Sequence, residues 1–211
     1  MSRRVLVIGA SRGIGLGLVD RHLADGWEVH ATTRDGIAPR THSRLTPHRL
    51  DVRDLDQSTS LVAALEHPLD RVVHNAGINR GLRAEIMEVN CEAPIRLVQA
   101  LVDAGRLRPE GLVAIMTSQV GARRGRSGSL GDYGDSKAAL NDEFRRRAPA
   151  WRDAGVVAVV VHPGWVRTDM GGPAAPLSVE ESVDGMAGLF DRLTRHDHGR
   201  FLTWDGREHP W

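Results

Sequence analysis

The chain has 211 residues, 41% of them hydrophobic and 26% charged, which is the composition of an ordinary soluble globular protein. A formal net charge of +1 gives no electrostatic reason to expect nucleic acid or a membrane surface as a partner. The single cysteine, Cys91, excludes an intrachain disulfide and favours a reducing, cytoplasmic location. No segment approaches the roughly 20 apolar residues of a membrane span. We therefore expect one domain over residues 1–211.

The chain begins with a short β-branched run at residues 5–8, which predicts a strand buried on both faces. It leads directly into the glycine-rich segment Gly9-Ala10-Ser11-Arg12-Gly13-Ile14-Gly15, after which apolar residues recur at helical spacing. Such a turn lets the backbone approach a pyrophosphate, whose charge the N-terminus of the following helix stabilises. The spacing G-x-x-x-G-x-G differs from the common G-x-G-x-x-G fingerprint, and a plain tight turn is the alternative interpretation.

The end of the second expected strand, within residues 27–34, bears on the choice of nucleotide. In a dinucleotide-binding fold an acidic residue at this point binds the ribose hydroxyls, but this chain has Thr33 followed by Arg34. Because a guanidinium can bind a phosphate through two parallel hydrogen bonds, we expect NADP(H) to be preferred over NAD(H). Arg12 could supply a second cation. The alternative is a solvated Arg34 that the neighbouring Asp35 neutralises.

A third short strand is expected to end at residues 50–52, where Asp51 could accept a hydrogen bond from an adenine amino group. Asp54 is the better candidate to cap the helix that follows. The fourth strand, residues 70–74, leads into Asn75-Ala76-Gly77, a small turn placed where open α/β sheets bind their ligands.

Helical spacing resumes over residues 86–101, where Asn90 lies inside the helix and Pro94 kinks or interrupts it. Two further apolar runs, residues 112–116 and 156–161, predict buried strands. The first ends in Thr117-Ser118, and the second in Pro163-Gly164-Trp165-Val166-Arg167-Thr168.

The last part of the chain continues the alternation of helices and strands. Ser178 with Glu181 three residues later matches the capping-box pattern and predicts the start of a helix. Residues 201–204 predict a final strand. Strands that alternate with helices along the whole length predict a parallel sheet covered on both faces.

Tyr133 is the only tyrosine of the chain and Lys137 is its only lysine. On a helix this spacing places both side chains on one face, one turn apart. Arginine cannot replace lysine where chemistry needs a compact, tunable ammonium group. Because a nearby ammonium favours the phenolate form of tyrosine, the pair is typical of a general acid/base. The pattern alone has many false positives, and an exposed pair without a function is the alternative.

The chain resembles the short-chain dehydrogenase/reductase family over nearly its full length. The resemblance is carried by the glycine-rich turn, Asp51-Val52, Asn75-Ala76-Gly77, Asn90, Ser118, Tyr133-x-x-x-Lys137 and Pro163-Gly164. Residues 162–172 and the tail 204–211 look like those of the carbonyl-reductase branch related to C-factor and sniffer. The resemblance implies a single-domain, Rossmann-type, doubly wound parallel sheet of about seven strands, ordered 3-2-1-4-5-6-7, with helices on both faces.

The resemblance also implies the chemistry, a reversible hydride transfer between a nicotinamide and a carbonyl or alcohol substrate. Tyr133 would protonate the carbonyl oxygen, Lys137 would lower the pKa of Tyr133 and bind the nicotinamide ribose, and Ser118 would orient the substrate oxygen. Asn90 would hold a water that returns protons to Lys137. The NADP-binding residues would be Gly9, Ser11, Arg12, Gly13, Ile14, Gly15, Thr33, Arg34, Asp51, Val52, Asn75, Ala76, Gly77, Tyr133, Lys137, Pro163, Gly164, Val166 and Thr168.

Two segments depart from the family pattern. Twelve residues separate Gly77 from Asn90, fewer than in many relatives, so the helix between them must start late and we expect a homodimer rather than the usual tetramer. The expected substrate loop, about residues 169–178, is short and rich in glycine, proline and alanine. This composition predicts an open pocket with Val120, Trp165 and Met170 as an apolar wall.

Two groups of side chains invite other interpretations. Arg123, Arg124 and Arg126 could attract an acidic substrate, but a solvated loop is the expected state because exposed charges are the default. His196, His198 and His209 lack the further ligands of a closed metal site, so no metal is expected. One alternative function stays open, a non-catalytic NADP-binding sensor or signalling protein on the same fold.

Overall fold

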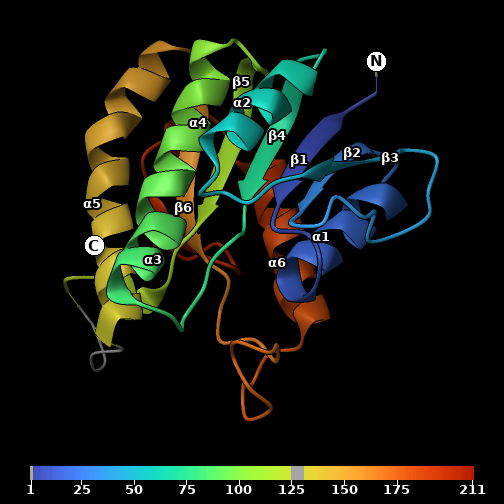
Figure 1. The fold of residues 1–211 in the computed structure, drawn as a ribbon. Helices are drawn as coiled ribbons and strands as arrows, with labels where there is room; N and C mark the ends of the chain where they lie inside the picture. The colour runs from blue at the N-terminus through green and yellow to red at the C-terminus, as the bar shows by residue number, and fades with distance from the viewer. Residues whose placement is uncertain (1, 125–130) are drawn as a thin grey trace.

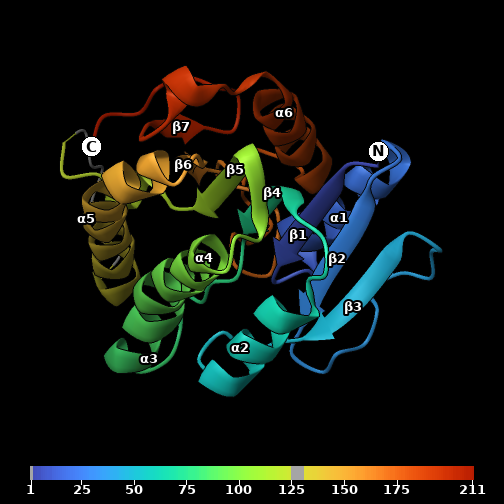
Figure 2. The same cartoon turned by 90° about the horizontal axis from the view of Figure 1, so that it is seen from above.

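The β-branched runs of the sequence form the centre of a seven-stranded parallel sheet in the computed structural model, which describes residues 2–124 and 131–211. The strand order is β3-β2-β1-β4-β5-β6-β7 (Figure 1, with β7 labelled in Figure 2). The strands are β1 (Arg4–Ile8), β2 (Glu28–Thr33), β3 (Leu45–Arg49), β4 (Leu69–His74), β5 (Leu107–Met116), β6 (Val157–His162) and β7 (Phe201–Thr203). This order confirms the fold class that the resemblance implied.

Helices cover both faces of the sheet, as the view from above shows (Figure 2). One face carries α1 and α6, and the other carries α2, α4 and α5. The helical elements are α1 (Gly13–Ala24), α2 (Leu55–Ala64), α3 (Arg83–Met87), the π-helical turn η1 (Glu88–Glu92), α4 (Ala93–Asp103), η2 (Gln119–Gly121), α5 (Gly131–Asp153), α6 (Val179–Arg192) and η3 (Arg195–Asp197). No helix in the described part of the chain is long and apolar enough to cross a membrane.

The sheet order reverses between β1 and β4, and this reversal positions the candidate site. The chain leaves β1 through α1 on one face, whereas the connection out of β4 runs through α3 and α4 on the other. Connections that diverge in this way open a crevice at the carboxyl ends of the strands, which is where open α/β sheets bind ligands.

Two helix starts confirm the sequence predictions at the level of side-chain contacts. The Asp54 carboxylate accepts a hydrogen bond from the backbone N–H of Gln57 at the start of α2. Ser178 and Glu181 form a reciprocal capping box at the start of α6, with distances of 3.0 and 2.7 Å. These bonds satisfy N–H groups that the first turn of a helix leaves without a partner.

Two predicted strand limits were wrong. β3 ends at Arg49, so Asp51 lies beyond the strand rather than at its end. β5 begins at Leu107 instead of residue 112, because its first residues include a polar Arg-Pro-Glu-Gly segment that no apolar pattern marks. Glu110 has a positive φ of 60° there, and the pairing with β4 shifts register between Leu69 and Arg71.

The predicted late start of the helix before Asn90 is confirmed, since α3 has only five residues. The helix then widens into the π turn that contains Asn90, and α4 starts at once with Pro94 in its first turn. Glu92 just before α4 is itself helical, with φ −73° and ψ −47°. Pro94 therefore lies within a continuous helical segment, directly after the π turn.

Close packing between α6 and the segment after β7 leads to a prediction about stability. A Cβ added to Gly185 would lie 2.8 Å from Cζ3 of Trp204, whereas a Cβ added to the exposed Gly188 meets only Arg192 at 4.0 Å. Gly185→Ala is expected to lower the free energy of unfolding by about 1–3 kcal/mol through overpacking. Gly188→Ala, the matched control on the same helix, is expected to raise it by up to about 1 kcal/mol. Urea unfolding measures both, and equal changes would contradict the packing argument.

Candidate active site

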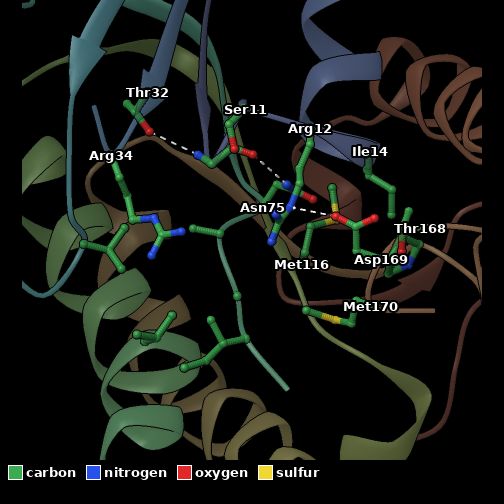
Figure 3. Close-up of a pocket in the computed structure, with 18 of the residues that line it drawn as sticks. Ser11, Arg12, Ile14, Thr32, Arg34, Asn75, Met116, Thr168, Asp169 and Met170 are labelled. Atoms are coloured by element: carbon green, nitrogen blue, oxygen red, sulfur yellow. Dashed lines mark hydrogen bonds and ion pairs between the residues drawn. The ribbon is translucent and has the colours of Figure 1, made fainter. Parts of the chain in front are cut away.

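A cavity of about 510 Å³ lies at the carboxyl ends of the central strands (Figure 3). Most residues predicted for the site line this cavity: Gly9, Ser11, Arg12, Gly13, Ile14, Thr33, Arg34, Asp51, Val52, Asn75, Ala76, Gly77, Tyr133, Lys137, Pro163 and Thr168. The wall thus extends from the end of β2 to the start of α5. Segments far apart in the sequence form one continuous site.

The turn after β1 is held against the turn after β4. The N–H of Gly9 donates to the Thr32 hydroxyl at 3.0 Å, and the Asn75 amide donates to the Gly9 carbonyl at 3.0 Å. A Cβ at Gly9 would lie 2.8 Å from Cα of Ala76, and its φ of +82° is unfavourable for any other residue. Glycine at this position therefore allows the two turns to meet at the floor of the cavity.

The start of α1 has the features of an anion-binding helix N-terminus. Its N-cap residue, Arg12, makes no side-chain cap, and the first turn carries no acidic residue. The backbone N–H groups there are left for a ligand, and the helix dipole favours a negative one. This uncapped helix end, with Gly13 and Ile14 in the cavity wall, fits the pyrophosphate of a dinucleotide.

Arg34 lies at the β2 end of the cavity and is exposed (Figure 3). No ion pair within the described residues involves it. The Asp35 carboxylate instead accepts a hydrogen bond from the N–H of Ile37 at 3.0 Å, and this bond is the main reason that its pKa is lowered. The side-chain contacts therefore do not support the alternative in which Asp35 neutralises Arg34.

Asp51 is held by a residue that the sequence analysis did not single out. Arg53 donates to both oxygens of the Asp51 carboxylate, at 3.0 and 2.7 Å, and also to Glu85 at 2.8 Å. The bonds from Arg53 lower the pKa of Asp51 to about 2. Asp51 therefore stays ionised at neutral pH and presents a fixed carboxylate at the cavity edge.

The loop between β6 and α6, residues 163–178, contributes Arg167, Thr168, Asp169 and Met170 to the cavity wall. Its two ends pair with each other, since the N–H of Arg167 donates to the Leu177 carbonyl at 2.8 Å. Arg12 and Asp169, which both line the cavity, form an ion pair at 3.3 Å (Figure 3). Both of these side chains are about three-quarters exposed, so screening by water makes the contact weak.

Lys137 and Tyr133 lie one turn apart on α5, as their spacing predicted, and both line the cavity. The Lys137 ammonium nitrogen is 6.0 Å from the centre of the Tyr133 ring and donates to the Met116 carbonyl at 2.9 Å. Lys137 is 4% exposed, and burial lowers its pKa to about 8. The alternative interpretation of an exposed pair was therefore wrong on the exposure.

The expectation that Lys137 lowers the pKa of Tyr133 does not describe the net effect here. Burial raises the pKa of Tyr133, because a phenolate loses more from desolvation than a neutral phenol does. A hydrogen bond with Ser118 works in the opposite direction.

Ser118 and Asn90 lie behind the cavity wall. Ser118 caps the short helix η2, with its hydroxyl accepting from the N–H of Val120 at 3.4 Å. Asn90 is fully buried in the π turn and binds both backbone groups of Ile78, at 2.8 and 2.7 Å, and the Ser136 hydroxyl at 3.0 Å. Asn90 therefore links the turn after β4 to α5.

Three residues predicted to bind the cofactor do not contribute to the cavity wall: Gly15, Gly164 and Val166. Gly15 packs against the first turn, where an added Cβ would lie 2.7 Å from the Asn75 amide. Gly164 has a φ of +87° and packs under Trp204. These residues shape the loops that carry the lining residues.

The remaining predicted groups divide into structural and exposed residues. His198 is buried and bonds to the Ala148 carbonyl at 2.8 Å, and among the described residues no group of three or more His, Cys, Asp or Glu could hold a metal. Trp165 and Met170 are 53% and 43% exposed beside the cavity, while Val120 is buried. Of the loop arginines, Arg123 pairs with Asp142.

Arg126, the third of the loop arginines, lies outside the described residues. The sequence analysis also missed two residues of the described chain that shape the site. Thr32 accepts the hydrogen bond from Gly9, and Thr117 bonds to Asn141 on α5. A polar residue at the end of a buried strand was the only available signal for either of them.

Comparison with known proteins identifies the family of this chain. A profile described as short chain dehydrogenase matches residues 3–176. The chain belongs to the short-chain dehydrogenase family. As a short-chain dehydrogenase, it is an NAD(P)-dependent oxidoreductase.

Relatives of this short-chain dehydrogenase include C-signal of Myxococcus xanthus, 36% identical over 156 residues, which are 68% of this chain and 93% of that protein. The structure is similar to that of NADPH-bound carbonyl reductase from chicken fatty liver, with a TM-score of 0.91, 32% identity, and 100% and 99% of the two chains covered. Carbonyl reductase Sniffer of D. melanogaster gives a TM-score of 0.90 at 27% identity, with 100% of each chain covered. These similarities confirm the carbonyl-reductase-like branch of the family.

Proposed function

We propose that this short-chain dehydrogenase is an NADPH-preferring reductase that transfers hydride reversibly between the nicotinamide and a carbonyl or alcohol substrate. The observation that carries the proposal is the pair of half-buried Tyr133 and buried Lys137 in the cavity wall, with Ser118 hydrogen-bonded to Tyr133. A phenol that keeps its proton at neutral pH and is hydrogen-bonded to a hydroxyl is suited to give that proton to a carbonyl oxygen.

In this proposal the nucleotide supplies the hydride, and the protein orients the reactants and supplies the proton. Tyr133 donates its phenolic proton to the substrate oxygen. The Ser118 hydroxyl orients that oxygen and stabilises the negative charge that develops on it. Lys137, with a pKa of about 8, can give and take a proton near neutral pH. Asn90 keeps the turn after β4 aligned with α5 beside them and holds the water for proton return.

The remaining lining residues would hold the nucleotide. The uncapped start of α1, with Gly9, Gly13 and Ile14, would bind the pyrophosphate through backbone N–H groups. Arg34 at the β2 end would bind the 2′-phosphate of NADP(H). The proposed preference for NADP(H) is supported by two solved relatives, the chicken carbonyl reductase bound to NADPH and a reductase from Pseudomonas aeruginosa bound to NADP.

Arg34→Asp is expected to weaken NADPH binding by roughly 10- to 100-fold and to improve binding of NADH, because it removes charge-assisted hydrogen bonds and restores a carboxylate for the ribose hydroxyls. Cofactor titration followed by nicotinamide fluorescence measures both affinities. Arg40→Ala is the matched control, since Arg40 pairs with Asp20 on the surface and does not line the cavity. A wild-type preference for NADH, or an unchanged NADPH affinity in Arg34→Asp, would contradict this account.

One experiment separates the reductase from the alternative of an NADP-binding sensor. NADPH oxidation is followed with a panel of aldehydes, ketones and quinones, using wild type and Tyr133→Phe in parallel. Turnover that needs Tyr133 supports the reductase, whereas tight NADPH binding without turnover across the panel supports the sensor. Location in the cytoplasm and a homodimeric rather than tetrameric assembly stay predictions.

A further inference from the structure

Asn141 is a buried polar residue on the same face of α5 as Tyr133 and Lys137. It follows Lys137 by four residues, which is one helical turn, and it is 3% exposed. A buried amide needs hydrogen-bond partners for both its oxygen and its nitrogen. Asn141 finds both of them in the segment that carries Ser118.

The two partners of Asn141 lie at the two ends of that segment. The Thr117 hydroxyl donates to the Asn141 amide oxygen at 2.7 Å, and the Asn141 amide nitrogen donates to the Gly121 carbonyl at 3.3 Å. Thr117 directly precedes Ser118, and Gly121 ends the short helix that Ser118 caps. A single side chain on α5 therefore bonds on either side of Ser118.

Packing leaves this segment little freedom to move away from α5. A Cβ added to Gly121 would lie 2.7 Å from the backbone carbonyl carbon of Lys137, so the two backbones are in direct contact. The N–H of Thr117 is bonded to the Val161 carbonyl of β6 at 2.8 Å. Asn141 thus completes a junction between β5, η2 and α5, and Ser118 lies inside this junction.

We propose that Asn141 is a positioning residue that sets the Ser118 hydroxyl against the phenol of Tyr133. Ser118 and Tyr133 come from different elements, fifteen residues apart in the chain. Their hydrogen bond depends on the alignment of η2 with α5, and an error of about 1 Å in a reacting geometry can cost roughly 100-fold in rate. The inference rests on the proposed function, because the alignment of Ser118 with Tyr133 affects the rate only if both residues act in the proposed reaction.

The chain itself provides a readout that does not depend on turnover. Tyr133 is the only tyrosine, so the ultraviolet absorbance change on phenol ionisation reports Tyr133 alone. The hydrogen bond with Ser118 lowers the pKa of Tyr133. Loosening Ser118 should therefore move the titration midpoint upward, in the same direction as removing the Ser118 hydroxyl.

The test compares Asn141→Leu, Thr117→Val and Thr117→Ser. Asn141→Leu removes both hydrogen bonds at similar volume, and Thr117→Val removes one. Both are expected to raise the Tyr133 midpoint by about half a pH unit or more, and to lower kcat by about 10- to 100-fold. NADPH affinity should stay within about twofold in each variant. Thr117→Ser keeps the hydroxyl and is expected to bring the midpoint back toward the wild-type value.

Trp151→Phe is the matched control for loss of a buried hydrogen bond on the same helix. The Trp151 indole donates to Gln99 at 3.0 Å, away from the cavity. This variant is expected to lose thermal stability without any shift of the Tyr133 midpoint. If Asn141→Leu does not fold, Thr117→Val alone decides the question.

Two outcomes separate this inference from the proposed function. If Asn141→Leu and Thr117→Val melt at lower temperature but leave both the Tyr133 midpoint and the pH profile of kcat unchanged, Asn141 is purely structural and the inference is wrong. If the midpoint shifts as expected but the wild type turns over no carbonyl substrate, the alignment holds and the reductase proposal fails.

Discussion

Tyr133→Phe is expected to lower kcat for NADPH-dependent carbonyl reduction by about 10²–10⁴-fold, the usual contribution of a general acid. The phenyl ring fills the same volume but has no proton to give, and no second tyrosine can replace it. NADPH affinity should change little, because the other cavity-lining residues are untouched. Rapid-mixing measurement of a single turnover gives the chemical rate, and fluorescence titration gives the affinity.

The same variant carries its own spectroscopic control. Because Tyr133 is the sole tyrosine, Tyr133→Phe should abolish the phenol titration completely. If this variant keeps more than about a tenth of the wild-type turnover, another group delivers the proton. The proposed role of Tyr133 would then be wrong, although the family and fold would stand.

Lys137→Met is expected to cost roughly 10²–10³-fold in kcat and yet to stabilise the protein below pH 8. Burial lowers the pKa of Lys137 from 10.5 to about 8, so holding its charge in the folded state costs about 3 kcal/mol at neutral pH. Methionine keeps the aliphatic volume without the charge. The Met116 carbonyl loses its donor and offsets part of the gain, leaving a net stabilisation of about 1–2 kcal/mol.

The sign of this effect sets its pH dependence. Between pH 8 and 10.5 the unfolded chain binds a proton at Lys137 that the folded protein does not bind. The titration of Lys137 therefore increases the free energy of unfolding of the wild type as the pH rises. The advantage of Lys137→Met should therefore shrink across this window. Burial raises the pKa of Cys91 to about 11, which lowers stability above pH 9, and the Lys137 charge opposes this rise. Because Lys137→Met removes that charge, the Cys91 contribution differs between the two proteins above pH 9, and the comparison is clearest between pH 7 and 9.

Urea unfolding of the wild type and Lys137→Met at several pH values from 7 to 10 measures this difference. A variant that is less stable than the wild type at pH 7 would contradict the burial argument. Together with Tyr133→Phe, the result would show whether the buried Lys137 lowers the stability of the fold while it supports the reaction. Buried ionisable groups at active sites commonly have both effects.

A series of hydrogen bonds connects the turns and helices that form the site. The glycine-rich turn meets the turn after β4, and Asn90 joins that turn to α5. Asn141 then joins α5 to the segment of Ser118. A change in any of these contacts is expected to reach Tyr133 through packed backbone rather than through a long flexible path.

Much of the fold could be predicted from the sequence because its signals are local. The β-branched runs, the glycine-rich turn and the capping residues Asp54 and Ser178 each act within a few residues. The start of β5 could not be found, because its first residues pair with β4 through a register shift around a polar segment with a residue of positive φ. The π turn around Asn90 was missed for a similar reason, since its spacing resembles that of an ordinary helix.

The sequence by itself determined the order of strands and helices, the family, and the pairing of Tyr133 with Lys137, because helical spacing and motif order depend only on neighbours along the chain. Only the tertiary structure decided the electrostatics and the alignment of the site. Burial raised the pKa of Tyr133 where a nearby ammonium was expected to lower it, and Asn141 acquired its partners from another element. Desolvation and contacts between distant segments exist only once the chain is packed, so no local pattern could reveal them.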